Sequence, residues 1–167
     1  MDNTPFMHTF VAGWADMDWN RHMANTAYLD KAVDARVLAL GRLGLTLDVF
    51  LRHGVGVVVM ADEVRYRREV MWMEEIGIDF ELAGLADDAS RFKVRNRIFR
   101  RTGGGSEVCA TITSTGGFID LATRTLVAPP PAIASAYRAL PKSEDYEALP
   151  SSLRAPRAAG TCALAVT

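Results

Sequence analysis

A short polar segment near the N-terminus holds the side chains best suited to chemistry. Two carboxylates, one imidazole and two carboxamides fall within residues 16–25, and they belong to Asp16, Asp18, Asn20, His22 and Asn25. A carboxylate can attack an electrophilic carbon or take a proton from water, and an imidazole can move protons near neutral pH. These residue types at this spacing indicate a site that could act on a carbonyl group.

The same residues also suit the start of a helix, which is predicted to follow them. Asp and Asn are preferred N-cap residues, so any one of them can simply cap that helix. Capping needs only one such residue, however, whereas this segment has five polar groups flanked by Trp19 and Met23. A helix N-terminus also presents N–H groups with partial positive charge, which polarise a carbonyl oxygen while a carboxylate attacks or activates water. From the residues alone, both capping and catalysis stay open.

Several common catalytic motifs are absent from the sequence. Ser106 lacks the following glycine of a nucleophile elbow. The three histidines, at positions 8, 22 and 53, are too scattered for a zinc motif, and Gly54–Gly56 lacks the third glycine of a dinucleotide fingerprint. Cys109 and Cys162 form no CxxC pair and are expected to be reduced thiols, although a single disulfide stays open.

The elements that must position the polar segment are predicted from hydrophobic periodicity. Apolar residues spaced four, four, three and three apart mark one face of a helix that starts near Thr26 and stops near Gly44, namely Leu29, Val33, Val37, Leu40 and Leu43. One or two further helical turns are expected within 46–53. Strands are expected within 6–15 and at 55–68, 76–85, 91–101, 108–115 and 118–127. Gly116 and Gly117 are predicted to join the last two strands, and residues 132–140 to form a short helix.

Length and composition describe one globular domain. The chain has 167 residues and a formal net charge of −1. At roughly 150 residues per domain, a single domain is expected, placed at 1–140 and followed by a C-terminal tail at 141–167. The near-neutral charge argues against a nucleic-acid partner, and no stretch approaches the ~18 apolar residues of a membrane span. Because the N-terminus has no secretory signal, a cytoplasmic location is expected.

Strands separated by turns rather than by helices predict an antiparallel sheet. The apolar stripe of the long helix must be buried, and this sheet is the only predicted partner that is large enough. We therefore expect an α+β fold in which an antiparallel sheet wraps around one long central helix. The sheet would keep an uncovered face or edge, which favours a homo-oligomer, either a dimer or a dimer of dimers.

The polar segment resembles the signature of a known family. Residues 16–30 read DMDWNRHMANTAYLD, which is similar to the DxDxxGH(V/M)NNxxYL motif of the hotdog-fold thioesterases, the 4-hydroxybenzoyl-CoA thioesterase-like enzymes and their acyl-ACP thioesterase relatives. The resemblance continues at residues 64–66 and 118–131 and spans residues 6–140. It implies the hotdog fold, an antiparallel sheet around a central helix, in dimers or tetramers.

The resemblance also implies a role for each matching residue. Asp18 matches the catalytic carboxylate, which would be the nucleophile or general base on a thioester. Asn25 lies where the family uses a backbone N–H to hold the thioester oxygen. Asn20 and His22 match a DxNxH variant of the motif and would orient water or the carbonyl group. No metal and no cofactor is implied, because the thioester has a good leaving group and coenzyme A is part of the substrate.

Six further residues are candidates for substrate binding, namely Trp19, Tyr28, Arg65, Tyr66, Arg95 and Arg97. The two tyrosines match family tyrosines, and Trp19 could line an acyl pocket or hold a cationic acyl group. The three arginines could contact the phosphates of coenzyme A, since a guanidinium binds phosphate through paired hydrogen bonds. Each has a structural alternative, which is core packing for the aromatic residues and a solvated strand face for the arginines.

The leading hypothesis is an acyl-CoA thioesterase that hydrolyses a small-molecule substrate, an acyl-CoA, through Asp18. An acyl-ACP thioesterase is an alternative, motivated by the DxNxH variant. A non-catalytic acyl-CoA-binding module is a third, because Arg21 stands where the family has glycine and Ala24 replaces an asparagine. Asp62 is a further candidate acid if it shares a strand face with Tyr66, although a β-bulge would explain its position more simply.

Overall fold

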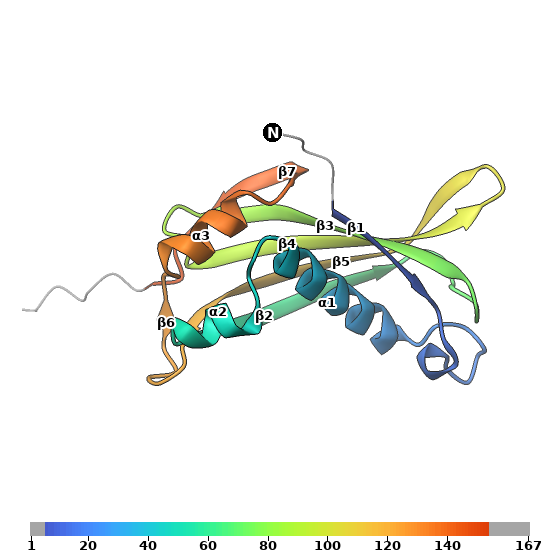
Figure 1. Cartoon of the computed structure of the whole chain (residues 1–167). Coiled ribbons are helices and arrows are strands. Elements are labelled where there is room, and N and C mark those ends of the chain that lie inside the picture. The colour runs from blue at the N-terminus through green and yellow to red at the C-terminus, as the bar shows by residue number, and fades with distance from the viewer. Residues whose placement is uncertain (1–5, 154–167) are drawn as a thin grey trace, which may run out of the picture.

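A long helix lies across one face of a curved sheet (Figure 1). The computed structural model describes residues 6–153, and the elements it contains appear in the following order. They are β1 (Phe6–Val11), a 3-10 turn (Trp14–Asp16), α1 (Asn25–Arg42), α2 (Leu47–Arg52), β2 (Val55–Tyr66), β3 (Glu75–Ala86), β4 (Arg91–Thr102), β5 (Gly105–Asp120), β6 (Leu126–Val127), α3 (Pro131–Arg138) and β7 (Lys142–Leu149).

The strands pair in the order β1-β3-β4-β5-β2, all antiparallel, while β6 pairs with β5 and β7 runs parallel to β3. Apolar side chains fill the space between α1 and this sheet in two clusters. One centres on Phe80, Phe92 and Phe118, and the other on Ile78 and Ile98. Each such side chain contributes about 1.5–3 kcal/mol when fully buried. The predicted α+β hotdog architecture is thus confirmed.

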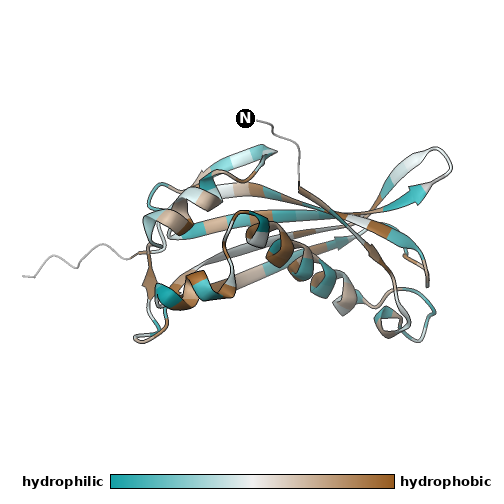
Figure 2. Cartoon of the chain, in the orientation of Figure 1, coloured by the Kyte–Doolittle hydropathy of each residue, from teal (hydrophilic) through white to brown (hydrophobic). Residues whose placement is uncertain are grey.

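The face of α1 that packs on the sheet coincides only in part with the predicted stripe, of which Leu29 and Leu40 are partly buried against the core. The buried residues are mostly small, namely Ala27, Tyr28, Ala32, Ala35, Arg36 and Ala39. Of the predicted stripe, Val33 is 43% exposed and Val37 is 63% exposed. Alanines let the helix approach the sheet closely, so the larger side chains turn toward the surface next to β2, where Figure 2 shows hydrophobic residues on α1 and α2.

The two strands predicted on either side of Gly116–Gly117 are a single strand, β5. These glycines are required by packing rather than by a turn. A Cβ atom at Gly116 would lie 2.5 Å from the ring of Phe92 and 2.5 Å from the carbonyl oxygen of Val58. The sheet therefore runs uninterrupted past both positions.

The segment after residue 140, predicted as a C-terminal tail, contains one more strand of the sheet. Residues 142–149 form β7, which pairs with the second half of β3 at Gly84, Leu85 and Ala86. The segment is polar, and its edge position lets most of its side chains face solvent. The rest of the predicted tail from residue 154, including Cys162, lies outside the described residues. No helix within residues 6–153 is long and apolar enough to cross a membrane.

Candidate active site

A tight turn shapes the polar segment between β1 and α1. The N–H of Asp18 donates to the carbonyl of His22 at 2.9 Å, and the N–H of Arg21 donates to the carbonyl of Asp18 at 3.1 Å. Arg21 has a φ of +69°, in the left-handed region. That conformation costs about 1 kcal/mol or more for a residue with a side chain and nothing for glycine. The turn therefore forms without the family's glycine, at some cost in strain.

The side chains of Asp18 and His22 face each other within this turn. Oδ1 of Asp18 accepts a hydrogen bond from the N–H of Asn20 at 2.7 Å, and Oδ2 lies 3.6 Å from Nδ1 of His22. The two side chains are 30% and 27% exposed, so a substrate can reach them. Asp16 is instead structural, since it accepts from the N–H of Gly13 at 2.8 Å and pairs with Lys31 at 3.2 Å.

The N-terminus of α1 has no side-chain cap. Its N-cap residue is Ala24, which has no side-chain oxygen, and no other side chain caps the helix. The backbone N–H groups of Asn25 and Thr26 have no hydrogen-bond partner within residues 6–153. The capping interpretation of the polar segment is therefore wrong for α1. Two N–H groups that carry the partial positive charge of the helix remain available to a ligand.

A pocket of about 340 Å³ opens beside Asp18 and Asn25. Five of its lining residues were predicted as site residues, namely Asp18, His22, Asn25, Tyr28 and Tyr66. Four were not in the predicted site, namely Met23, Arg67, Arg68 and Glu69. The pocket thus gathers the turn, the start of α1, the end of β2 and the segment after β2.

The two tyrosines use their hydroxyl groups to hold the pocket together. Tyr66 Oη donates to the carbonyl of Asn25 at 3.0 Å, and Tyr28 Oη donates to the carbonyl of Arg68 at 3.3 Å. Their rings contact edge to face, with centroids 5.3 Å apart. Burial raises the pKa of the Tyr28 phenol, which keeps it a hydrogen-bond donor. Both tyrosines therefore tie β2 and the following segment to the start of α1.

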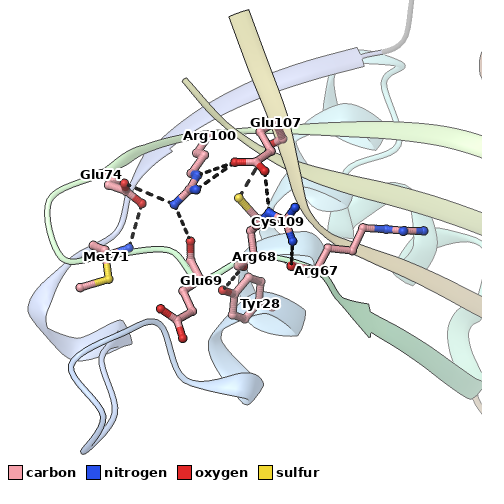
Figure 3. Close-up of polar contacts among 9 residues, drawn as sticks. All are labelled: Tyr28, Arg67, Arg68, Glu69, Met71, Glu74, Arg100, Glu107 and Cys109. Carbon is pink, nitrogen blue, oxygen red and sulfur yellow. Dashed lines mark hydrogen bonds and ion pairs between the residues drawn. The ribbon is translucent and has the colours of Figure 1, made fainter. Parts of the chain in front are cut away.

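An ion-pair cluster fixes the segment after β2 against the end of the sheet (Figure 3). Glu107 accepts hydrogen bonds from Arg68 Nε at 2.6 Å and from Arg100 Nη2 at 2.9 Å, and these two guanidinium groups lower the pKa of its carboxyl group. Arg100 also donates to the carbonyl of Glu69 at 3.0 Å. As a result, Oε1 of Glu69 lies 4.0 Å from Nε2 of His22, and the imidazole stands between two carboxylates.

Two predicted site residues of the turn do not line this pocket. Trp19 is 98% exposed at the tip of the turn, and the Asn20 side chain is exposed beside it. Asn20 contributes through its backbone, whose N–H orients Asp18. Neither observation tests a contact with bound substrate, so their predicted roles stay predictions.

The three predicted arginines lie outside the Asp18 pocket. Arg65, Arg95 and Arg97 line a polar pocket of about 410 Å³ on the sheet face opposite α1. Arg95 is paired with Asp145 at 2.6 and 2.8 Å, and Arg97 with Asp79 at 2.6 Å and Glu81 at 2.7 Å. Arg65 donates to Glu63 at 2.7 Å. The role predicted for them in binding coenzyme A phosphates remains a prediction.

Arg67 joins the two pockets because it lines both of them. Its guanidinium has no hydrogen-bond or ion-pair partner within the described part of the chain, and Figure 3 shows it pointing away from the Glu107 cluster. Within residues 6–153, no group of three His, Cys, Asp or Glu side chains could hold a metal ion. Asp62 lies outside the Asp18 pocket and accepts a hydrogen bond from Ser114, next to the β-bulge at Val59–Ala61.

The fold described above is that of the hotdog class of thioester hydrolases. A family model described as the Thioesterase-like superfamily matches residues 12–137, and the chain belongs to this superfamily. The predicted family is thus confirmed, and a thioester hydrolase is the enzyme class it defines. A search of curated proteins found no match.

Solved structures with the same fold include proteins that act on or bind coenzyme A compounds. A 1,4-dihydroxy-2-naphthoyl-CoA thioesterase from Synechocystis has a TM-score of 0.72 and 15% identity, over 82% of this chain and 98% of its own. A Staphylococcus aureus protein solved in complex with CoA has a TM-score of 0.74 and 17% identity, over 94% and 92% of the two chains. A gentisyl-coenzyme A thioesterase has a TM-score of 0.67 and 13% identity, over 78% and 98%.

Proposed function

We propose that this protein is an acyl-CoA thioesterase in which Asp18 acts on the thioester. One observation carries the proposal: the carboxylate of Asp18 lies at the same pocket as Asn25, whose unpartnered backbone N–H stands at the start of α1. The first supplies a nucleophile or general base, and the second can stabilise the negative charge that develops on the carbonyl oxygen. Hydrolysis of a thioester needs both.

The proposed reaction starts with the thioester oxygen bound by the backbone N–H group of Asn25. Asp18 then attacks the acyl carbon or takes a proton from an attacking water molecule. If Asp18 attacks, a C–O bond forms between its carboxylate and the acyl carbon as the C–S bond breaks, and water then hydrolyses the resulting mixed anhydride to the carboxylic acid and restores Asp18. If water attacks, the C–O bond forms to water and the carboxylic acid is released directly. In both routes coenzyme A leaves as the thiol. His22, held between Asp18 and Glu69, orients the carboxylate and can carry the proton to the leaving sulfur.

Arg67 supports coenzyme A as the carrier of the acyl group. Its unpaired guanidinium stands between the Asp18 pocket and the polar pocket across the sheet edge. If the thioester of an acyl-CoA lies in the Asp18 pocket, the diphosphate of its coenzyme A would reach the Arg67 guanidinium there. A guanidinium suits phosphate contact. The KM of an acyl-CoA should therefore rise in Arg67→Met, while the KM of the matching acyl-pantetheine, which lacks the diphosphate, should not. Equal changes for both thioesters would remove this role.

We also propose that the working unit is a homodimer formed along β2, in the cytoplasm. Within residues 6–153 β2 is an edge strand that pairs only with β5. Val57, Val59 and Met60 on this strand are 41–45% exposed, beside the exposed Val33 and Val37 of α1. An unpaired apolar edge of this length is usually covered by another chain. The Asp18 pocket includes Tyr66 at the end of β2, so a second copy would border it.

Release of free thiol from a panel of acyl-CoAs tests the proposed activity. Asp18→Asn should lose about 10²–10⁴-fold in kcat, because an amide neither attacks the thioester nor accepts the proton. The matched control is Asp30→Asn, an exposed carboxylate on α1 that lies outside the pocket and should leave kcat unchanged.

Undiminished turnover by Asp18→Asn would remove Asp18 from the reaction. Saturable acyl-CoA binding without turnover by the unaltered protein would instead favour the non-catalytic alternative. Comparing one acyl group carried by coenzyme A and by ACP decides the carrier. We expect coenzyme A to be preferred, since Arg65, Arg95 and Arg97 are already paired with carboxylates of this chain and leave little basic surface for an acidic protein.

A further inference from the structure

Another pocket, of about 520 Å³, also reaches Asp18, and it shares no other lining residue with the Asp18 pocket. We call it the tryptophan pocket, and its lining residues are Trp14, Met17, Asp18, Arg21, Met71 and Trp72. They come from the 3-10 turn, the polar turn and the segment between β2 and β3, so none belongs to the surface of α1 and β2 proposed for the dimer. The tryptophan pocket is therefore a separate space beside the same carboxylate.

The walls of the tryptophan pocket are apolar and accessible. The rings of Trp14 and Trp72 contact edge to face, with centroids 6.1 Å apart. Both residues, together with Met71, are more than 40% exposed. Large apolar side chains that gather at a surface mark binding sites for ligands or partners. Because this group lies beside Asp18, the part of the molecule it suits best is the acyl group of the substrate.

Arg21 adds a positive charge to this apolar lining. Its side chain is exposed, and its guanidinium has no hydrogen-bond or ion-pair partner among residues 6–153. Its backbone is strained, whereas the glycine of the family motif would adopt the same φ without cost. Strained residues gather at functional sites, where the strain persists because the side chain is needed. An unpartnered cation at such a position points to an anionic group in the ligand.

The two pockets separate the two ends of the substrate. The Asp18 pocket continues to Arg67, where the diphosphate of coenzyme A is proposed to bind, so the pantetheine arm occupies that side. A thioester whose reacting carbon lies at Asp18 then places its acyl group in the tryptophan pocket. There the acyl chain meets apolar rings along its length and the guanidinium of Arg21, which can bind a carboxylate through paired hydrogen bonds.

We propose that the acyl group carries a second carboxylate at its far end, bound by Arg21, so that the substrate is a coenzyme A monothioester of a dicarboxylic acid. This names the substrate class of the proposed thioesterase and therefore rests on the proposed function. Asp18 and Arg21 belong to one turn, in which the N–H of Arg21 donates to the carbonyl of Asp18 at 3.1 Å, so a short acyl chain can span them. Indole rings also attract cations, but a cationic acyl group would be repelled by Arg21.

Two thioether analogues of coenzyme A test the recognition without hydrolysis. One carries a carboxypentyl group on the sulfur, and the other carries the neutral primary amide of the same shape. In calorimetric titrations the carboxylate should bind at least tenfold more tightly than the amide. Arg21→Met keeps the length of the side chain and removes its charge, so both analogues should then bind equally. The matched control is Arg52→Met, at the exposed end of α2 and outside both pockets, which should leave both affinities unchanged.

Two further variants keep the test decisive. Arg21→Gly removes the guanidinium and suits the backbone, so it should lose the preference for the carboxylate even if Arg21→Met does not fold. Trp72→Ala removes an apolar wall and should weaken both analogues by a similar factor. Equal affinities in the unaltered chain, a preference that survives in Arg21→Gly, or unchanged binding in Trp72→Ala would each overturn the proposal. Tighter binding of an analogue that ends in trimethylammonium would also overturn it.

Turnover separates this proposal from the proposed hydrolysis. The kcat/KM for the coenzyme A monothioester of hexanedioic acid should exceed that for the thioester of its monoamide, and Arg21→Gly should abolish the difference. If neither thioester is hydrolysed but the carboxylate analogue still binds through Arg21, the proposed activity fails and the recognition of the carboxylate stands. If both thioesters are hydrolysed equally and both analogues bind equally, the thioesterase stands and the dicarboxylic substrate is overturned.

Discussion

Arg21 is strained, and the strain can be measured. Its φ of +69° is unfavourable for arginine and ordinary for glycine. Arg21→Gly should therefore raise the free energy of unfolding by up to about 1 kcal/mol, after the greater flexibility of glycine in the unfolded chain is subtracted. Urea denaturation monitored by tryptophan fluorescence gives this quantity.

The matched control for Arg21 is Arg52→Gly, an exposed arginine at the end of α2 with ordinary helical geometry. This change should lower the free energy of unfolding, since glycine is a poor helix former. A decrease in stability for Arg21→Gly as well would show that the arginine side chain makes contacts that outweigh its backbone strain.

At the level of residues, the motif predicted the site residues that lie close together in the sequence. Asp18, His22 and Asn25 belong to one segment, and the turn and helix start bring them to one pocket. Glu69 was not predicted, because it reaches His22 only through the fold. Its position depends on Arg100 and Glu107, which come from two strands of the sheet. The spacing of residues in the sequence cannot predict such a contact.

The helices and strands were likewise predicted in some respects and missed in others. Alternation predicted β2, β3 and β4, but periodicity on α1 chose the face with larger side chains and missed the alanine face that the sheet buries. A pattern reports which residues are apolar, and it does not report which of two apolar faces meets the sheet. Gly116 was interpreted as a turn for the same reason, since the ring of Phe92 that excludes a side chain there belongs to another strand.

The attachment of β7 to the sheet should depend on pH. Hydrogen bonds from Arg95, and then from Ser143, lower the pKa of the Asp145 carboxyl group. A carboxyl group whose pKa is lowered by folding contributes stability above its ordinary pKa of about 3.9, and this contribution is lost as the pH falls below that value. Because the Asp145 side chain is 61% exposed, the contribution should be less than about 1 kcal/mol.

Hydrogen exchange measures this attachment directly. Amides of β7 should exchange faster at pH 3 than at pH 6 after correction for intrinsic rates, while amides of β5 should not change. Asp145→Asn should show the faster exchange already at pH 6, because the uncharged amide pairs poorly with Arg95. If β7 in Asp145→Asn is as protected as in the unaltered chain, the ion pair does not hold the strand.

At the scale of the whole molecule, an apolar region of α1 and β2 is uncovered within residues 6–153, and we expect this region to decide how many chains form the working unit. Val33 and Val37 on the helix and Val57 and Val59 on the edge strand are all more than 40% exposed. Val59→Arg would place a charge in any interface formed there, where burial without a partner is costly. The expected result is a shift from dimer to monomer, measured by sedimentation velocity.

Val11→Arg is the matched control for Val59→Arg, because Val11 is 51% exposed on β1, at the opposite edge of the sheet. It should leave the dimer intact.

Thioesterase activity should fall with dissociation in Val59→Arg, since the Asp18 pocket extends to Tyr66 at the end of the same strand. A monomeric unaltered chain, or a Val59→Arg variant that stays dimeric, would place the interface elsewhere. Full activity in a monomeric variant would show that one chain completes the site alone.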